Sequence, residues 1–344
     1  MPETLADIGE FGLIDRIDAL VQKAGMSLPE GILGIGDDCA VFQPRAGYEI
    51  LLTCDVMVEG RHYLPRFISP LELGRRAMSL NISDIGAMGG TPCYALISLG
   101  LQPDMPIADV EGIYSGFVEA LAPFGAAIVG GNITQSGGAN FIDITLIGEI
   151  ETGLSVLRST ARPGNAILVT GYPGEAAAGL HILLEERPLP DPADQPLVEA
   201  YNNPSHRARE GAAVAHTRLA TAMIDTSDGL LGDLGHICDQ SAVGARITQE
   251  NLPMSPALRQ AARERGRDPL TWVLGNSDDY ELIITCAPEH VADICSAVTR
   301  LNPIPVSHIG DITPASGRPG NIEIVTSDGM SRTISRSGWD HFAS

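Results

Sequence analysis

Apolar and polar residues follow both the helical and the strand period in the first half of the chain. Between residues 9 and 24, apolar residues recur every three or four positions, which predicts a helix with an apolar face formed by Phe11, Ile14, Ile17, Leu20 and Val21. The same patterns predict helices over residues 70–88 and 107–123 and strands over residues 49–54, 126–129 and 141–150. Helices and strands are therefore mixed in this half.

The second half repeats this mixture after a segment rich in turn formers. Residues 158–165 include Arg162-Pro163-Gly164 and punctuate the chain. Beyond them the pattern predicts helices over residues 175–186, 205–216 and 229–240, and strands over residues 167–170, 221–224, 243–248, 281–285 and 304–309. We therefore expect an α/β or α+β fold with two domains, residues 1–150 and 151–344.

The composition is that of a protein with full hydrophobic cores. Hydrophobic residues make up 44% of the 344 residues and charged residues 19%, which excludes a disordered polymer. The longest apolar runs are too short to cross a bilayer, and residues 1–20 carry acidic groups where a signal peptide needs basic ones. The six cysteines are scattered with no C-x-x-C pair, as expected of reduced thiols. These features predict a cytoplasmic protein with no membrane partner.

The charge of the chain limits how it can bind phosphates. The formal net charge is −21, so nonspecific binding to nucleic acid is not expected. Lys23 is the only lysine, and no glycine-rich loop precedes it. Because a P-loop and a protein kinase each place a lysine beside the phosphates, neither is predicted here. A nucleoside triphosphate bound by this chain would need metal ions held by carboxylates.

Aspartates gather at turns between the predicted elements. They form five groups: Gly36-Asp37-Asp38, Thr53-Cys54-Asp55, Asn81-Ile82-Ser83-Asp84, Asp225-Thr226-Ser227-Asp228-Gly229 and Asp278-Asp279. Mg²⁺ takes oxygen ligands in near-octahedral geometry, often one or two of them from carboxylates. Each aspartate alone is explained as well by a turn or a helix cap. Five groups together favour a site for several ions, but the sequence does not show that they converge.

The remaining candidate residues have two interpretations each. Gly130-Gly131 after a predicted strand would let a phosphate approach backbone amides, or would form a tight turn. His62 follows the strand that carries Asp55, and Trp339 would either pack in a core or stack on an aromatic ligand. A dinucleotide fingerprint is not predicted, because Gly34-x-Gly36-x-x-Cys39 lacks the third glycine. These residues add weight only in combination with the aspartates.

In their order along the chain, these residues resemble the thiamine-monophosphate kinases, a family in the superfamily of aminoimidazole ribonucleotide synthetase. The resemblance extends nearly from end to end. It rests on Gly9-Glu10-Phe11, Gly34-Ile35-Gly36-Asp37-Asp38-Cys39-Ala40, Asp55-x-x-Val58-Glu59-Gly60-x-His62-Tyr63, Asn81-Ile82-Ser83-Asp84-Ile85-x-Ala87-Met88-Gly89-Gly90, Ile224-Asp225-x-Ser227-Asp228-Gly229-Leu230 and Gly338-Trp339-Asp340-His341-Phe342.

The resemblance implies the two-domain aminoimidazole ribonucleotide synthetase-like fold. The N-terminal domains of two chains would pair into a β-barrel, which makes the protein a homodimer. Residues 1–150 would bind ATP and Mg²⁺ and form the dimer, and residues 151–344 would form a C-terminal α/β domain.

The resemblance also implies roles for single residues by motif match. Several Mg²⁺ ions would be bound by Asp38, Thr53, Asp55, Asp84, Asn132, Asp225 and Asp228. ATP would contact Gly131, Asn132, Arg158 and Ser227, and thiamine phosphate would face His62, Asp278 and Trp339. The catalytic residues would be Asp55, Asp84 and Asp228.

The implied reaction is ATP-dependent phosphorylation of thiamine phosphate to thiamine diphosphate. The acceptor is a phosphate monoester, which is largely a dianion near neutral pH and needs no strong general base. The enzyme must hold two anions in line and offset their repulsion. Carboxylates that carry several Mg²⁺ ions would do this without a lysine.

The chain departs from the family pattern at three places. Asn132 stands where the family has the aspartate of Gly-Gly-Asp-Thr-Thr, Asn276-Ser277-Asp278 stands where it has Gly-Gly-Glu, and Asn165 replaces an aspartate. Two other hypotheses follow from these departures. One is a paralogous kinase or synthetase that acts on another phosphorylated small molecule, and the other is a catalytically silent relative that has lost a metal ligand at Asn132.

Overall fold

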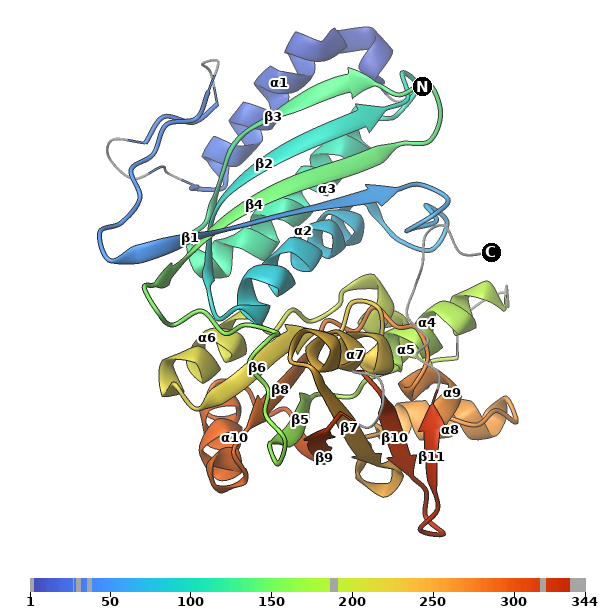
Figure 1. Cartoon of the computed structure of the whole chain (residues 1–344). Coiled ribbons are helices and arrows are strands. Elements are labelled where there is room, and N and C mark those ends of the chain that lie inside the picture. Colours follow the sequence, from blue (N-terminus) through green and yellow to red (C-terminus); the bar gives the residue numbers. More distant parts are fainter. Residues whose placement is uncertain are drawn as a thin grey trace. The chain divides into compact units, whose positions relative to one another are not determined.

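The computed structural model describes residues 3–26, 28, 32–35, 39–185, 191–315 and 320–334. Contacts divide the chain into a first unit, residues 1–85 and 90–152, and a second unit, residues 86–89 and 153–344. Each unit combines one sheet with several helices, so the expected mixture of helices and strands is confirmed (Figure 1). None of the described helices is long and apolar enough to span a membrane.

The first unit is built on a four-stranded sheet. Its strands are β1 (Tyr48–Val58), β2 (Thr91–Leu101), β3 (Ala127–Gln135) and β4 (Phe141–Glu151). Their spatial order is β1-β4-β2-β3, and only β2 and β3 run parallel. The sequence pattern missed β2, because residues 93–97 form a continuous apolar run in the sequence without a period of two.

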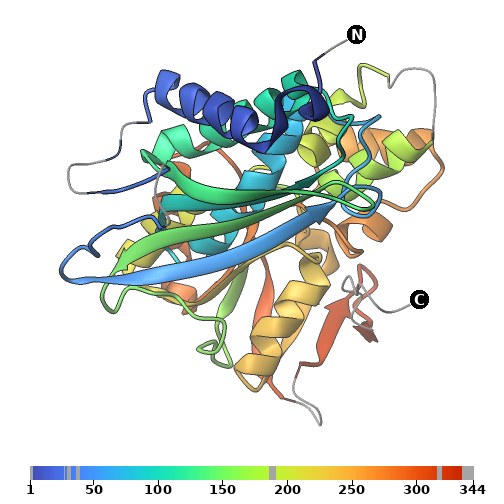
Figure 2. The same cartoon turned by 90° about the horizontal axis from the view of Figure 1, so that it is seen from above.

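Three helices lie on one face of this sheet: α1 (Leu5–Lys23), α2 (Pro70–Ala87) and α3 (Ile107–Leu121) (Figure 2). The single-turn helix η1 (Ala122–Phe124) follows α3. Helices α2 and α3 approach closely at Gly74 of α2. A Cβ there would lie 2.0 Å from the carbonyl oxygen of Ile113 on α3, so only glycine allows this contact. The expected apolar face of α1 was partly wrong: Leu13, Ile17 and Val21 are buried, whereas Phe11 is 80% exposed. The backbone departs from helical geometry at Gly9, two residues earlier, and this shifts the helical register.

The face of the four-stranded sheet that the helices do not cover carries both polar and apolar side chains, and several of the apolar ones are exposed. The exposure of the side chains alternates along β1. Thr53 and Asp55 are half-buried, whereas Leu52 is 69% exposed and Val56 is 47% exposed. On β4 the residues that pair with Thr53 and Asp55, Leu146 and Ile144, are fully buried. Thr53 and Asp55 therefore point to the face that the helices cover, and Leu52 and Val56 point away from it.

The second unit is built on a seven-stranded sheet with the order β11-β10-β7-β9-β5-β8-β6. All neighbouring pairs are antiparallel except β7 and β10. The strands are β5 (Ala166–Thr170), β6 (Ala220–Asp225), β7 (Val243–Thr248), β8 (Leu282–Cys286), β9 (Val306–Pro314), β10 (Ile322–Val325) and β11 (Ser331–Ile334).

Helices of the second unit pack on this sheet around one core. They are α4 (Glu175–Leu184), α5 (Gln195–Asn202), α6 (Ala208–Thr217), α7 (Leu230–Gln240), α8 (Pro256–Glu264), α9 (Leu270–Val273) and α10 (Val291–Thr299), with short turns η2 (Gln249–Asn251) and η3 (Pro288–His290). Helix α7 contacts β6 and β7 and contributes Leu234 and Ile237 to the core. This packing fixes the connection between β6 and α7, where the acidic segment 225–229 lies.

Candidate functional site

In the first unit the fold brings together candidate residues that are far apart in the sequence. Thr53 lies on β1 and Asp84 on α2, and the Thr53 hydroxyl donates a hydrogen bond to the Asp84 carboxylate. Asp55 is two residues further along β1 and points to the same face of the sheet. Asp84 is half-buried although its neighbours Asn81 and Ser83 are buried, so its carboxylate lies at the edge of the helix packing.

His62 lies in the turn at the end of β1. The backbone N–H of Val58 donates to His62 Nδ1 at 2.9 Å, and the His62 N–H donates to the Val58 carbonyl. Gly60 has a φ of 77°, which allows this tight turn. Because Nδ1 accepts a hydrogen bond, the neutral ring carries its proton on Nε2. The turn thus fixes both the orientation and the tautomer of His62.

Strand β3 places Gly131 and Asn132 differently from each other. A Cβ on Gly131 would lie 1.9 Å from the Ile97 carbonyl oxygen, so only glycine fits there. Asn132 pairs with Ser98, and Ser98 pairs with Asp143 on its other side. Paired residues share one face of a sheet, and this row shares the face of Leu52 and Val56. The Asn132 side chain therefore lies on the face opposite to Thr53 and Asp55.

In the second unit the segment 225–229 links β6 to α7 and is held by backbone hydrogen bonds. Thr226 is fully buried; its N–H donates to the Glu281 carbonyl at 2.8 Å, and its carbonyl accepts from the Tyr280 N–H at 2.9 Å. Its hydroxyl accepts from the Glu281 N–H at 3.0 Å. Gly229 has a φ of 106°, and a Cβ there would lie 2.2 Å from the Gly275 carbonyl oxygen. The loop therefore has one defined shape, with Ser227 and Asp228 half-buried at its tip.

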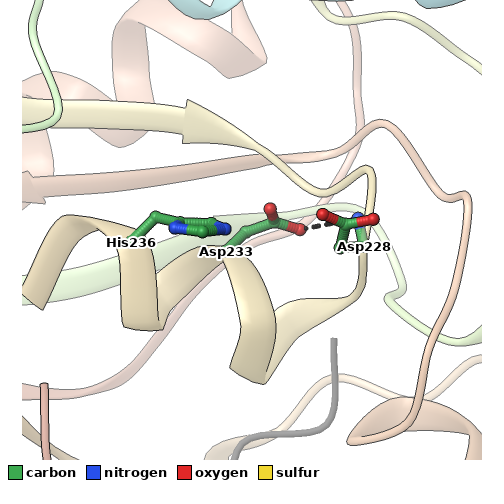
Figure 3. Close-up of side chains that lie close together, drawn as sticks. All are labelled: Asp228, Asp233 and His236. Atoms are coloured by element: carbon green, nitrogen blue, oxygen red, sulfur yellow. Dashed lines mark hydrogen bonds between the residues drawn. The ribbon is translucent and has the colours of Figure 1, made fainter. Parts of the chain in front are cut away.

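Asp228 belongs to a compact group of possible metal ligands with Asp233 and His236 (Figure 3). The ligand atoms of these three residues lie within 4.8 Å of one another. Asp233 and His236 both come from α7, and the Asp228 N–H donates to Asp233 Oδ2 at 3.0 Å. Asp228 is half-buried, Asp233 buried and His236 exposed, so the group opens towards solvent at one side.

Negative charge is concentrated around Asp233. Burial, and then the charge of Asp225, raises the pKa of Asp233 to about 8, although the Asp228 amide acts in the opposite direction. Asp225 itself is 1% exposed at the end of β6. Arg158 supplies a positive charge within electrostatic reach of Asp233. The structure thus places Asp225, Asp228 and Arg158 in one region of the second unit.

The segment that carries Asp278 is anchored on the first turn of α4. Asp279 Oδ2 accepts from the Gly174 N–H at 2.6 Å and Oδ1 from the Ala176 N–H at 2.9 Å, while Ser277 Oγ accepts from the Ala177 N–H at 3.3 Å. Burial raises the pKa of Asp279 to about 7, against the effect of these amides. Asp278, between these two anchors, is half-buried, whereas both anchors are buried.

A buried ion pair fixes the far end of the same segment. Glu281 accepts from Arg207 Nε at 2.7 Å and from the Thr170 hydroxyl, and both Arg207 and Glu281 are less than a tenth exposed. The Leu282 N–H donates to Thr170 Oγ1 at 2.8 Å. Because Tyr280 and Glu281 also bind Thr226, this network joins the Asp278 segment to the loop of Asp228.

Two of the expected site residues, Asp38 and Trp339, lie outside the described residues. Asp233 and His236 were not among the expected residues. The signal for them was an Asp-x-x-His spacing on the helix that follows Asp228, which puts both side chains on one helical face. The donors in both units are mainly carboxylate and hydroxyl oxygens, the ligand type that Mg²⁺ prefers. Within each unit these residues therefore fit the binding of Mg²⁺, with His236 as the one nitrogen donor in the group of the second unit.

The family comparisons cover most of the chain. The N-terminal domain model of AIR synthase related proteins matches residues 36–150, and the C-terminal domain model matches residues 162–318. Thiamine-monophosphate kinase of Escherichia coli K12 is 35% identical over 338 residues, which cover 97% of this chain and 98% of that protein.

Solved structures of thiamine-monophosphate kinases are also similar to this chain over nearly its whole length. A crystal structure of thiamine-monophosphate kinase from Stenotrophomonas maltophilia K279a superposes with a TM-score of 0.79 at 30% identity, covering 94% of this chain and 97% of that one. A structure described as AaThiL complexed with AMPPCP and TMP superposes with a TM-score of 0.75 at 33% identity, with 98% of each chain covered. The similarity therefore spans both units and not a single motif.

Proposed function

The chain belongs to the thiamine-monophosphate kinase family, and we propose that it transfers the γ-phosphoryl group of ATP to the phosphate of thiamine phosphate, giving thiamine diphosphate and ADP. The observation that carries this proposal is the similarity over nearly the whole chain to proteins of that name. The complex with AMPPCP and TMP supports it further, since AMPPCP is an analogue of ATP and that relative binds it together with TMP.

We assign the binding of several Mg²⁺ ions to Asp38, Thr53, Asp55, Asp84, Asn132, Asp225 and Asp228, as the motifs imply. Bound Mg²⁺ would offset the charge of the phosphates. The contact between Thr53 and Asp84 supports this assignment in the first unit, and the group around Asp228 supports it in the second. Among these residues the Asn132 side chain has the least structural support as a Mg²⁺ ligand, because it lies on the other face of the sheet.

ATP is assigned to Gly131, Asn132, Arg158 and Ser227, and thiamine phosphate to His62, Asp278 and Trp339. Gly131 packs closely against the Ile97 carbonyl of β2, which fixes its position on β3, and the anchors of Ser277 and Asp279 hold Asp278 in place. Asp55, Asp84 and Asp228 act as the catalytic residues, because they would hold the charge-neutralising ions. Transfer between two oriented anions needs positioning more than proton transfer.

The proposal includes a homodimer formed through an N-terminal domain, residues 1–150, with residues 151–344 as the C-terminal domain. Ile50, Leu52, Val56 and Leu96 support it, because they are between 36% and 69% exposed on one sheet face. Adjacent exposed apolar side chains of this size are typical of a surface that another chain covers. The proposal places the protein in the cytoplasm, where ATP is available and where scattered cysteines stay reduced.

A direct assay tests the proposed reaction. Purified protein with Mg·ATP and thiamine phosphate should form ADP and thiamine diphosphate in equal amounts, as followed by chromatography. Thiamine and other phosphate monoesters serve as control acceptors. ADP formation that thiamine phosphate does not stimulate, or that another phosphorylated compound stimulates more, would contradict the proposal.

A further inference from the structure

Asp233 is a buried carboxylate whose hydrogen bond reaches back to the loop before its helix. It lies in the first turn of α7 and is 2% exposed. Its Oδ2 accepts the N–H of Asp228, five residues earlier, at 3.0 Å (Figure 3). Gly229, between them, has a φ of 106°, which turns the chain so that this amide faces the helix. The contact thus fixes the backbone of the residue whose carboxylate is at the loop tip.

The surroundings of Asp233 are unfavourable for a carboxylate that serves the helix alone. Its neighbours are the carboxylates of Asp225 and Asp228 on the loop, His236 on its own helix, and Arg158 from the segment before β5. A carboxylate near a helix N-terminus is ordinarily stabilising, and an exposed position suffices for that effect. Here the group is buried beside two like charges, which costs free energy that Arg158 offsets in part and that a bound cation would offset further.

We propose that Asp233 is a positioning residue for a divalent cation bound by Asp228. By holding the Asp228 amide, Asp233 orients the Asp228 backbone and presents its carboxylate to the cation. Partners behind a metal ligand commonly change metal affinity by about 10- to 100-fold when they are removed. The inference rests on the proposed function, in which Asp228 binds Mg²⁺, and adds a residue that family resemblance did not assign.

Three substitutions separate positioning from charge. Asp233→Ala removes the acceptor and the charge. Asp233→Glu keeps the charge but moves the acceptor by one methylene, and Asp233→Asn keeps an acceptor in place without the charge. Positioning predicts that the Ala and Glu variants bind a cation about 10- to 100-fold more weakly and that the Asn variant stays close to the unsubstituted protein. A purely electrostatic role predicts the reverse order for Glu and Asn.

The measurement is Mn²⁺ binding to the full chain with AMPPCP present, by titration calorimetry and by the electron paramagnetic resonance signal of free Mn²⁺. It needs no acceptor and no turnover, so it stays informative even if thiamine phosphate is not the substrate. Asp239→Asn, an exposed position on the same helix, is the matched control and should leave Mn²⁺ affinity unchanged. Circular dichroism confirms that each variant is folded.

If Asp233→Ala does not fold, the Mn²⁺ affinities of the Glu and Asn variants still test the proposal. In an Asp228→Asn background, Asp233→Ala should have little further effect, since it acts through Asp228. Equal Mn²⁺ affinity in the Glu variant and the unsubstituted protein would overturn the proposal. So would an Asn variant that binds as weakly as the Glu variant.

Discussion

The two units hold their acidic residues in different ways. In the first unit, Thr53 and Asp55 lie on a regular strand and Asp84 on a regular helix, joined by the hydrogen bond between Thr53 and Asp84. In the second, Asp228 lies on a loop whose shape depends on Thr226, Gly229 and Asp233. Ligands on regular elements are placed by the fold itself, whereas ligands on a loop need supporting residues. Function should therefore be sensitive to more residues in the second unit than in the first.

The largest expected effect comes from the ligands themselves. Asp84→Asn and Asp228→Asn should each lower kcat/KM by at least about 100-fold, because each removes a carboxylate that would hold a cation needed to offset the charge of the phosphates. The measurement is steady-state kinetics at saturating and limiting Mg²⁺. Added Mg²⁺ should restore part of the rate where the loss lies in metal affinity. Full activity of either variant would contradict the metal-binding role proposed for that residue.

A second test addresses the exposed sheet face, a feature of the first unit. Leu52→Glu places a charge among exposed apolar residues, and it should weaken the dimer by at least about tenfold because an unpaired charge in an interface is costly. Sedimentation equilibrium measures this. Leu301→Glu is the control in the second unit, where the leucine is 54% exposed. Dimers of unchanged strength in the Leu52 variant would contradict assembly through this face.

Two threonines offer a matched comparison of the units. Thr226→Val leaves the buried Glu281 N–H without its side-chain acceptor and should lower the free energy of unfolding by about 1–3 kcal/mol. Thr53→Val removes a donor to a half-buried carboxylate that water can reach, and should cost less than about 1 kcal/mol. Urea unfolding of both variants gives the two values. Equal costs would mean that the loop is no more tightly held than the strand.

The smallest effect concerns the pH dependence of stability. Burial raises the pKa of Asp279 from 3.8 to about 7, so the folded chain retains a proton that the unfolded chain releases, and this contribution to stability falls as pH rises across that interval. Asp279→Asn does not titrate. The free energy of unfolding of the unsubstituted protein, relative to that of the variant, should therefore be larger at pH 5 than at pH 7.5. Thermal unfolding at both values checks this, and a difference independent of pH would contradict the raised pKa.

Regular elements with a clear period could be predicted from the sequence. Helix α2 was expected over residues 70–88 and spans Pro70–Ala87, and β7 was expected over 243–248 and spans Val243–Thr248. Strand β2 could not be found, since residues 93–97 are all apolar, although Ala95 and Ile97 are buried and Leu96 is 36% exposed on the other face. The sequence indicated which acidic residues lie near turns, but it did not predict the distances between their side chains.

The candidate site was predictable as a set of motifs and not as a geometry. Resemblance supplied the residues, but only strand register shows that Asn132 pairs with Ser98 and lies on the opposite face from Asp55. The role of Asp233 depends on the positive φ of Gly229, which brings residues five apart into contact. Such contacts arise from backbone geometry that spacing alone does not specify.

Phosphoryl transfer from ATP to thiamine phosphate can be followed with an isotope. ATP labelled at the γ-phosphorus is incubated with Mg²⁺, thiamine phosphate and the protein, and the products are separated and their label located. The label is expected in the terminal phosphate of thiamine diphosphate, and Asp228→Asn should lower its rate of transfer by at least about 100-fold. Label found only in free phosphate, or in no product at all, would contradict the proposed reaction.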